Sequence, residues 1–326
     1  MRWWTRGSKW GPAAADEMSE AAAQVHKPLA GQREPGLAGR IMANRRVQAG
    51  GGFLFVLVLA SALTLPWTLD DASRMYFDHQ DPGRSRAAPA ASLEMAFGAD
   101  PLGRSVLARC LLGGAMSLGI GISAALISVV LGVSVGLVSG YCGGWIDAAL
   151  MRFVDILYGL PYILLVILIQ VAFDAQRPWN VVVLVGAIGL VSWLTMARVV
   201  RGQVLSLRAQ PFIEAARAAG LPALRIFRRH LLPNLVGPVI VYATLLVPQA
   251  ILQESFLSFL GVGIQRPIPT WGAMAAEGIP EALNQVYSRW WLLVFPCTLL
   301  GLTLLCLNFL GDGLRDVLDP RSSTRI

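Results

Sequence analysis

The sequence predicts an all-α, polytopic membrane protein with six transmembrane helices, and three observations carry this prediction. Hydrophobic residues make up 55% of the 326 residues and charged residues only 14%, below the roughly 25% charge of a typical soluble domain. The mean hydropathy is +0.57. Six apolar segments each reach the roughly 20 residues that a membrane-spanning helix needs; they lie near 50–67, 113–139, 151–173, 181–198, 235–255 and 290–310.

Glycine and proline mark individual spans. In the second span, Gly132, Gly136 and Gly140 form two overlapping GxxxG patterns, which allow helix backbones to approach closely in lipid. Prolines interrupt the third, fifth and sixth spans, and the kinks they cause suit transporters but occur in any polytopic protein. These prolines are Pro161, Pro238, Pro248 and Pro296.

The basic residues predict the orientation of the spans. With the N-terminus inside and six crossings, the inside segments are 1–49, 140–152, 198–234 and the residues after 310. These segments hold 19 Lys and Arg, and the outside loops hold 8. Because basic residues concentrate on the cytoplasmic side, both termini are expected in the cytoplasm. The net charge of +7 is spread between apolar runs, so we expect no nucleic-acid partner.

The regions outside the spans divide the chain further. Residues 1–39 are expected to form a disordered basic cytoplasmic tail, since they are rich in Ala, Gly and Pro. Residues 40–49 are expected to form a basic interfacial segment, either a short helix on the membrane surface or a solvated positive anchor. Residues 50–310 form the transmembrane domain, and residues 311–326 form a cytoplasmic C-terminal tail. The first apolar run starts too late for an ordinary cleaved signal peptide.

The chain lacks the residue patterns of several chemistries. Its only lysines, Lys9 and Lys27, stand outside any Gly-x-x-x-x-Gly-Lys-Ser/Thr context, which a P-loop needs so that its lysine reaches the nucleotide phosphates. The histidines are far apart, without paired metal-ligand spacing, and the four cysteines form no CxxC or regular framework. We therefore expect no catalytic residue, no metal and no cofactor in this chain, and we do not expect an enzyme.

Four ionisable residues fall within or at the edges of spans, namely Asp147, Arg152, Asp155 and Glu254. Ionisable groups there are costly and usually face a partner or water. Arg152 and Asp155 are three residues apart, so they can pair on one helix face. We favour structural pairing over substrate binding for these groups.

The loop between the fourth and fifth spans contains the most informative local pattern. Pro211 can open a helix, and the charge of Glu214 suits the dipole of its first turn. Gly220 predicts the C-terminal stop, and Pro222 begins a second short helix. Leu232-Pro233 is expected to end that helix and return the chain to the membrane.

The surface of this loop suits contact with another protein. Ala215 and Ala216 are strong helix formers with small side chains, so a partner can pack close. Arg217 and the arginines of the second helix give the loop an exposed basic face. An ordinary amphipathic loop is the alternative. Glu-Ala-Ala alone is common, but the glycine four residues after Ala216 and Leu-Pro twelve beyond it resemble the EAA loop with which ABC-importer permeases dock onto an ATPase.

Blocks along the rest of the chain extend this resemblance. They lie at 97–105, 117–121, 140–155, 160–161, 198–201, 230–234, 258–263, 267–272, 311–316 and 319–321. Together they resemble the C-type permease subunit of the dipeptide, oligopeptide and nickel ABC importer family, from about residue 40 to the end. Three positions depart from the family pattern: Ala99 stands where threonine is usual, Ser105 where aspartate is usual, and Met116 where arginine is frequent. These departures lie near the outer end of the second span, where they can alter outer-gate contacts or substrate preference.

The resemblance implies a type I ABC importer permease fold in the cell inner membrane, with a cytoplasmic EAA coupling loop over about 209–233. The ATPase-coupling residues it implies are Glu214, Ala215, Ala216, Arg217, Gly220, Leu232 and Pro233. It also implies a heteromer in membrane lipid. A homologous B-type permease completes the pathway, two ABC ATPase subunits bind ATP and Mg, and an extracytoplasmic binding protein delivers substrate.

The substrate implied by the resemblance is a di- or oligopeptide, with a nickel chelate, glutathione or another small solute as alternatives. The sequence leaves open which residues line the pathway and whether the two ATPases are identical. An ion-coupled secondary transporter is the alternative of another class. Such transporters often show inverted repeats, and no clear repeat is found in this sequence.

Overall fold

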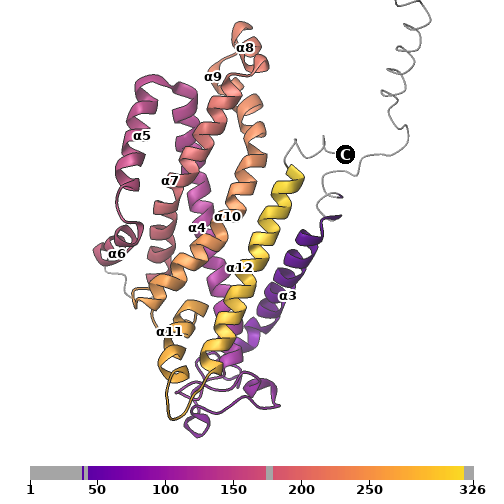
Figure 1. Cartoon of the computed structure of the whole chain (residues 1–326), viewed down its shortest axis with the longest axis vertical. Coiled ribbons are helices and arrows are strands. Elements are labelled where there is room, and N and C mark those ends of the chain that lie inside the picture. The colour runs from indigo at the N-terminus through magenta and orange to yellow at the C-terminus, as the bar shows by residue number, and fades with distance from the viewer. Residues whose placement is uncertain (1–38, 40–42, 174–178, 319–326) are drawn as a thin grey trace, which may run out of the picture. The chain divides into compact units, whose positions relative to one another are not determined.

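The structure is a computed structural model that describes residue 39 and residues 43–173 and 179–318. The chain divides into two units, residues 1–40 and 41–326. The second unit is built mainly of helices (Figure 1). In chain order they are α3 (Arg45–Thr68), α4 (Val106–Cys142), α5 (Gly144–Tyr158), α6 (Tyr162–Ala172), α7 (Asn180–Arg208), α8 (Pro211–Ala218), α9 (Ala223–Ile226), α10 (Leu232–Phe259), α11 (Trp271–Ala282) and α12 (Trp291–Leu318).

Five continuous helices in the described residues are long and apolar enough to cross a membrane. They are α3, α4, α7, the run Ala223–Phe259 that joins α9 to α10, and α12. The pair α5 and α6 passes the same test together and supplies the sixth crossing if it is one span. The structure thus confirms an all-α protein with five to six apolar spans.

The third predicted span, near 151–173, is not one straight helix. α5 and α6 meet at an angle of 88°, with Gly159, Leu160 and Pro161 between them. Pro161 lacks an N–H and disfavours the helical conformation of Leu160 before it, so the helix stops there. The other three prolines lie inside α10 and α12, so they do not break these helices. The kinks that we expected there stay predictions.

The most extensive helix packing joins α4 to α7. A Cβ at Gly132 would lie 2.5 Å from the Cβ of Met196, and one at Gly136 would lie 2.6 Å from the carbonyl oxygen of Ala197. Side chains at these glycines would therefore push the two helices apart. The GxxxG pattern is confirmed as a packing surface.

The two ends of the bundle differ in what they carry. α8 and α9 lie at one end and α11 lies toward the opposite end, and the start of α3 and the end of α12 are the ends of those helices that point toward α8 (Figure 1). We call the two ends of the bundle the α8 end and the α11 end. A Cβ at Gly313 would lie 2.4 Å from Val47, so α3 and α12 are in close contact at the α8 end. Within residues 43–318, the segments that the sequence assigns to the inside lie toward this end (Figure 1).

The structure covers the predicted flanking regions only in part. Residues 45–49 form the first turn of α3, and residues 40–42 lie outside the described residues. α12 continues through residues 311–318. The expected disordered tail, apart from residue 39, and the block at 319–321 also lie outside the described residues, so these expectations stay predictions.

α11 is a helix that the sequence did not predict. It has 12 residues, about 18 Å at 1.5 Å per residue, which is too short to cross a bilayer. Its first residue, Trp271, is fully buried and donates from Nε1 to the carbonyl oxygen of Cys110 at 3.0 Å. α11 is therefore anchored against the first turns of α4.

Candidate functional site

The first of the two short helices predicted in the loop is α8. Pro211 lies at its start and Glu214 in its first turn, as expected. Ile213 and Ala216 are buried, and Glu214, Ala215 and Arg217 are exposed. One face of this short helix therefore packs on the protein, and the opposite face, with the Glu-Ala pair, is free for another molecule.

Gly220 forms the break after α8. Its φ is +72°, a backbone conformation that glycine adopts without steric cost. Its N–H donates to the carbonyl oxygen of Arg217 at 2.9 Å, and the N–H of Leu221 donates to that of Ala216 at 3.2 Å. These bonds close the helix end, as expected for a glycine stop.

The second half of the loop differs from the prediction. Leu232 and Pro233 do not end a helix, because Ala223–Phe259 is one continuous helix. A π-helical turn at Phe227–Leu231 joins α9 to α10. Inside an α-helix, a proline ring clashes with the carbonyl group four residues before it, which for Pro233 is the carbonyl of Arg229. A π-helical turn is wider and leaves room for this carbonyl. We therefore attribute the unbroken helix through Pro233 to the π turn. Leu232 and Pro233 are exposed on this helix.

α8 is tied to three long helices. Ile213 and Ala216 belong to a buried cluster with Leu137 of α4, Val204 of α7 and Leu235 of α10. Burial of such apolar side chains is the main stabilising term for a short helix. A force on α8 therefore acts directly on the bundle.

Two arginines reinforce this attachment. Arg208, at the end of α7, donates to the carbonyl oxygens of Gly140 and Tyr141 at 3.1 and 2.9 Å. It thereby satisfies carbonyls at the end of α4, which lack helical partners. The guanidinium of Arg217 lies over the ring of Tyr141, 5.5 Å from its centroid. The end of α4 thus contacts α7 and α8 together.

The free face of the loop is charged and unpaired. Within the described residues, Glu214 forms no ion pair, and neither do Arg225, Arg228 and Arg229. These three arginines line an open surface hollow of about 530 Å3. Charges left without partners in the chain itself suit contact with another protein.

Both aspartates of α5 are paired with arginines of the neighbouring α7. Asp147 accepts two hydrogen bonds from Arg201, both 2.6 Å, and a further one from Ser139. Asp155 accepts from Arg198 at 2.7 Å. The structural pairing that we favoured is confirmed for both aspartates. The Arg152–Asp155 pair is wrong, because the partner of Asp155 comes from the neighbouring α7.

Glu254 is buried at the α11 end of α10. It is fully shielded from solvent and accepts hydrogen bonds from the hydroxyls of Ser258 and Thr270 at 2.7 and 2.8 Å. Its partners lie inside the protein, so a structural role is supported here too. They are hydroxyls rather than a cation.

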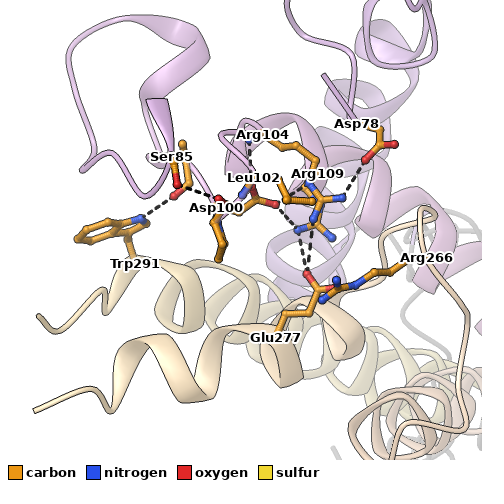
Figure 2. A network of polar contacts seen from close by, with 11 residues as sticks. Asp78, Ser85, Asp100, Leu102, Arg104, Arg109, Arg266, Glu277 and Trp291 are labelled. Carbon is orange, nitrogen blue, oxygen red and sulfur yellow. Dashed lines mark hydrogen bonds and ion pairs between the residues drawn. The ribbon is translucent and has the colours of Figure 1, made fainter. Parts of the chain in front are cut away.

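A network of ion pairs fixes the α11 end (Figure 2). Arg104 donates from Nε to Asp100 at 2.6 Å and from Nη1 to Asp78 at 2.8 Å. Arg109 donates from Nη1 to Asp100 at 2.9 Å. Asp100, Arg104 and Arg109 are all buried. We call this network, with Glu277 and Arg266, the charge clamp.

The charge clamp joins segments far apart in the sequence. Glu277 of α11 accepts from Arg109 at 3.0 Å and from Arg266 at 2.8 Å. Figure 2 shows the two arginines converging on this carboxylate. Removing one member of a buried ion network leaves another charge uncompensated, which is strongly destabilising. The clamp therefore holds α11 against the start of α4, and its partners were not predicted.

Two of the three departures from the family pattern have structural roles near this clamp. Ser105 precedes α4, and its hydroxyl oxygen accepts from the N–H of Ala108 at 3.3 Å. Serine and aspartate are similarly good at this capping position. Ala99 is fully buried. The structure gives no reason for methionine at position 116.

In the described part of the chain, no group of three or more His, Cys, Asp and Glu side chains is placed to hold a metal ion. The polar groups that the sequence analysis missed lie instead inside spans. Ser192 and Thr195 of α7 are three residues apart, and Gln249 and Gln253 of α10 are four apart. Such spacing puts each pair on one helix face, so a shared polar face on each helix could have been predicted from the sequence.

Comparisons with known proteins agree with this architecture. The binding-protein-dependent transport system inner membrane component family matches residues 129–324. The oligopeptide transport system permease protein OppC of Haemophilus influenzae is 43% identical over 269 residues, 82% of this chain and 81% of its own. OppC of Escherichia coli K12 is 45% identical over 282 residues, 86% and 89% of the two chains. The dipeptide transport system permease protein DppC of Bacillus subtilis is 47% identical over 225 residues, 69% and 68%.

A solved structure shares the fold. One chain of the inward-facing MetNI methionine ABC transporter superposes with a TM-score of 0.53 at 18% identity. The match covers 64% of this chain and 94% of that chain. At this identity the likeness shows the type I importer permease fold alone.

Proposed function

The chain belongs to the family of binding-protein-dependent transport system inner membrane components, and we propose that it forms half of the pathway of an ATP-driven peptide importer. The observation that carries this proposal is its 43–47% identity to oligopeptide and dipeptide permeases over most of its length. A transport subunit of this kind catalyses no reaction itself. It changes shape when a partner hydrolyses ATP.

The proposed complex has four kinds of component. A homologous B-type permease encloses the pathway together with this chain, two ABC ATPases bind ATP and Mg, and an extracytoplasmic binding protein delivers di- or oligopeptides. The absence of a P-loop lysine in the sequence supports placing nucleotide on the partners.

The α8 loop is the proposed contact with an ATPase. Its exposed face combines Glu214 and Ala215 with the turn at Gly220, and its buried face is held by α4, α7 and α10. Movement of the ATPase would therefore be passed to the spans through packed apolar side chains. The exposed Leu232 and Pro233 would extend this contact along the following helix.

The protein is a multi-pass inner-membrane protein, and we propose that both termini are cytoplasmic. The excess of basic residues in the inside segments supports this orientation. So does the direction of the two terminal helices, because the start of α3 and the end of α12 both point toward α8 (Figure 1).

The test is transport by the complete assembly. The chain would be co-expressed with the B-type permease, the two ABC ATPases and the binding protein of its own organism, purified and placed in liposomes. Labelled trialanine, glutathione and a nickel–histidine chelate would be offered with and without ATP. We expect ATP-dependent uptake of trialanine. Uptake of only the chelate or glutathione would reassign the substrate, and uptake driven by an ion gradient without the ATPases would refute the importer.

A further inference from the structure

A cavity of about 300 Å3 opens beside the break between α5 and α6. Its wall combines the end of α5 and the start of α6 with the middle of α7 and the second half of α10. Its polar lining residues are Tyr158, Tyr162, Ser192, Thr195, Gln249 and Gln253, with Leu157, Leu160, Val191, Leu194 and Leu246 between them. The volume lies at the lower end of the range for ligand pockets.

The cavity lies near the middle of α7. Ser192 and Thr195 are 12 and 15 residues from the start of α7 at Asn180, and 16 and 13 from its end at Arg208. At 1.5 Å per residue this is about 18–24 Å from either end. Polar side chains at such depth are costly against lipid and mark a water-filled path or a partner.

The polar groups of the cavity lack the partners that such groups usually find in a bundle. Within the described residues, neither Thr195 nor Gln249 forms a side-chain hydrogen bond, and both are exposed. Ser192 and Gln253 share only one long contact of 3.4 Å. The hydroxyl of Tyr162 is buried without a partner. By contrast, Gln170 in the same bundle bonds to the carbonyl of Val262 at 2.8 Å.

We infer that this cavity contacts the backbone of the transported peptide as it passes the middle of the membrane. The inference rests on the proposed function and adds the residues that meet the substrate. Glutamine amides donate and accept hydrogen bonds at once, as peptide groups do, and Ser, Thr and Tyr hydroxyls can do either. The lining therefore matches the part of a peptide that is the same whatever its sequence.

No charged side chain lines the cavity itself, and the nearest guanidinium on record, that of Arg198, lies behind the lining on the ring of Tyr158, 4.0 Å from its centroid. On the same helices, Asp155 and Arg198 pair with each other at 2.7 Å, and the carboxylate of Glu254 is buried among hydroxyls. A fixed charge would hold peptides of opposite charge tightly and repel others, whereas neutral hydrogen-bonding groups bind weakly. Weak contact suits a pathway that substrate must leave again.

The first experiment separates substrate contact from folding. Thr195→Val removes the hydroxyl at nearly constant volume, Thr195→Ser keeps it, and Gln253→Leu removes the amide. Thr244→Val in α10 is the control, since that hydroxyl bonds to Val241 of its own helix at 2.8 Å. All variants would be tested in the reconstituted complex for trialanine uptake and for ATPase activity stimulated by the binding protein.

We expect Thr195→Val and Gln253→Leu to lower trialanine uptake roughly fivefold to tenfold, the effect of one lost hydrogen bond. Stimulated ATPase activity should stay near the wild-type rate, and Thr195→Ser and Thr244→Val should transport normally. Normal uptake by both cavity variants, in a complex whose wild type transports trialanine, overturns the inference. Absence of uptake by the wild type contradicts the proposed function instead.

A second measurement asks what occupies the cavity. In a chain with the exposed Cys142 and Cys297 replaced by serine, Ser192→Cys would be labelled by a water-soluble thiol reagent during turnover. Ser134→Cys, on an exposed face of α4, is the matched control. We expect faster labelling at residue 192 and slower labelling when trialanine and binding protein are added. If residue 192 is labelled as slowly as residue 134, and trialanine does not change its rate, the partner permease covers the cavity and the inference fails.

Discussion

Arg201 of α7 donates two hydrogen bonds, each 2.6 Å long, to the two carboxylate oxygens of Asp147 in α5. The residues are 54 apart in the sequence, yet this contact fixes the angle at which α5 leaves the end of α4. The same carboxylate accepts from Ser139. Because α5 forms one wall of the central cavity, the pair also sets the position of that wall.

Replacing either member of this pair should lower stability, and the two effects should not add. We expect a coupling energy of about 1–2 kcal/mol from the cycle of Arg201→Ala, Asp147→Ala and the double variant, because the pair is bidentate and half-buried. Thermal unfolding of the assembled complex measures it. Arg46→Ala, which removes the exposed pair with Asp316, serves as the control. Strict additivity would show that the two side chains act independently.

The break at Gly220 should be essential for coupling. A Cβ there would meet no atom within 4 Å, so substitution acts through backbone strain and through the partner surface. Asn tolerates a positive φ and has nearly the shape of Asp. We expect Gly220→Asp to abolish uptake and Gly220→Asn to lose less, with membrane insertion and the permease pair intact in both.

The measurement for Gly220 is peptide uptake together with co-purification of the ATPases. Glu214→Ala should be milder, since it removes one polar contact worth roughly 1–3 kcal/mol. If Gly220→Asp transports normally with the ATPases bound, the α8 loop is not the coupling element.

The glycine stripe of α4 should tolerate no side chain where it meets α7. A Cβ at Gly136 would lie 2.6 Å from the carbonyl oxygen of Ala197, and we expect Gly136→Ala to destabilise the chain by about 1–3 kcal/mol through overpacking. Gly119→Ala is the control on the same helix, because its Cβ would meet nothing within 4 Å. The melting temperature should fall in Gly136→Ala and not in Gly119→Ala. Equal changes in the two variants would mean that the helix propensity of alanine, and not overpacking, determines the effect.

The charge clamp should depend on Asp100. Asp100→Asn keeps an acceptor for the N–H groups of Leu102 and Arg104 but leaves two buried arginines with less opposing charge. We expect a loss of about 3–5 kcal/mol, the usual cost of breaking a buried pair. Glu94→Gln, which weakens the more exposed pair with Arg84, should cost little. Thermal unfolding that is unchanged in Asp100→Asn would refute the clamp as a stabilising element.

Acid should weaken the α11 end through Glu281. Hydrogen bonds from Arg86 and then from Arg289 lower the pKa of this carboxyl. A carboxyl with a lowered folded-state pKa stabilises the protein above its unfolded pKa, about 4.3, and loses that contribution as the pH falls through the folded value. We expect the stability gap between wild type and Glu281→Gln, measured by thermal unfolding, to close below about pH 4. A gap that stays constant into strong acid would contradict this.

Local chemistry explains how much of the candidate site could be predicted. Pro211 at a helix start, Glu214 in the first turn and Gly220 at positive φ follow from preferences of single residues and their neighbours. The continuation through Leu232 and Pro233 could not be predicted in this way. It depends on a π-helical turn at Phe227–Leu231, and a proline alone gives no sign of such a turn.

The sequence alone was enough to predict the all-α class, the apolar spans, the glycine face of α4 and the α8 helix with its glycine stop. These features depend on burial in lipid and on backbone conformation, and both are determined by residues that are close together in the chain. The folded chain was needed to establish three other features. Asp155 pairs with Arg198 rather than Arg152, Arg109 meets Glu277, and polar pairs from α7 and α10 face one cavity. These contacts join residues tens to hundreds of positions apart, and helix packing, which depends on shape across many segments at once, brings them together.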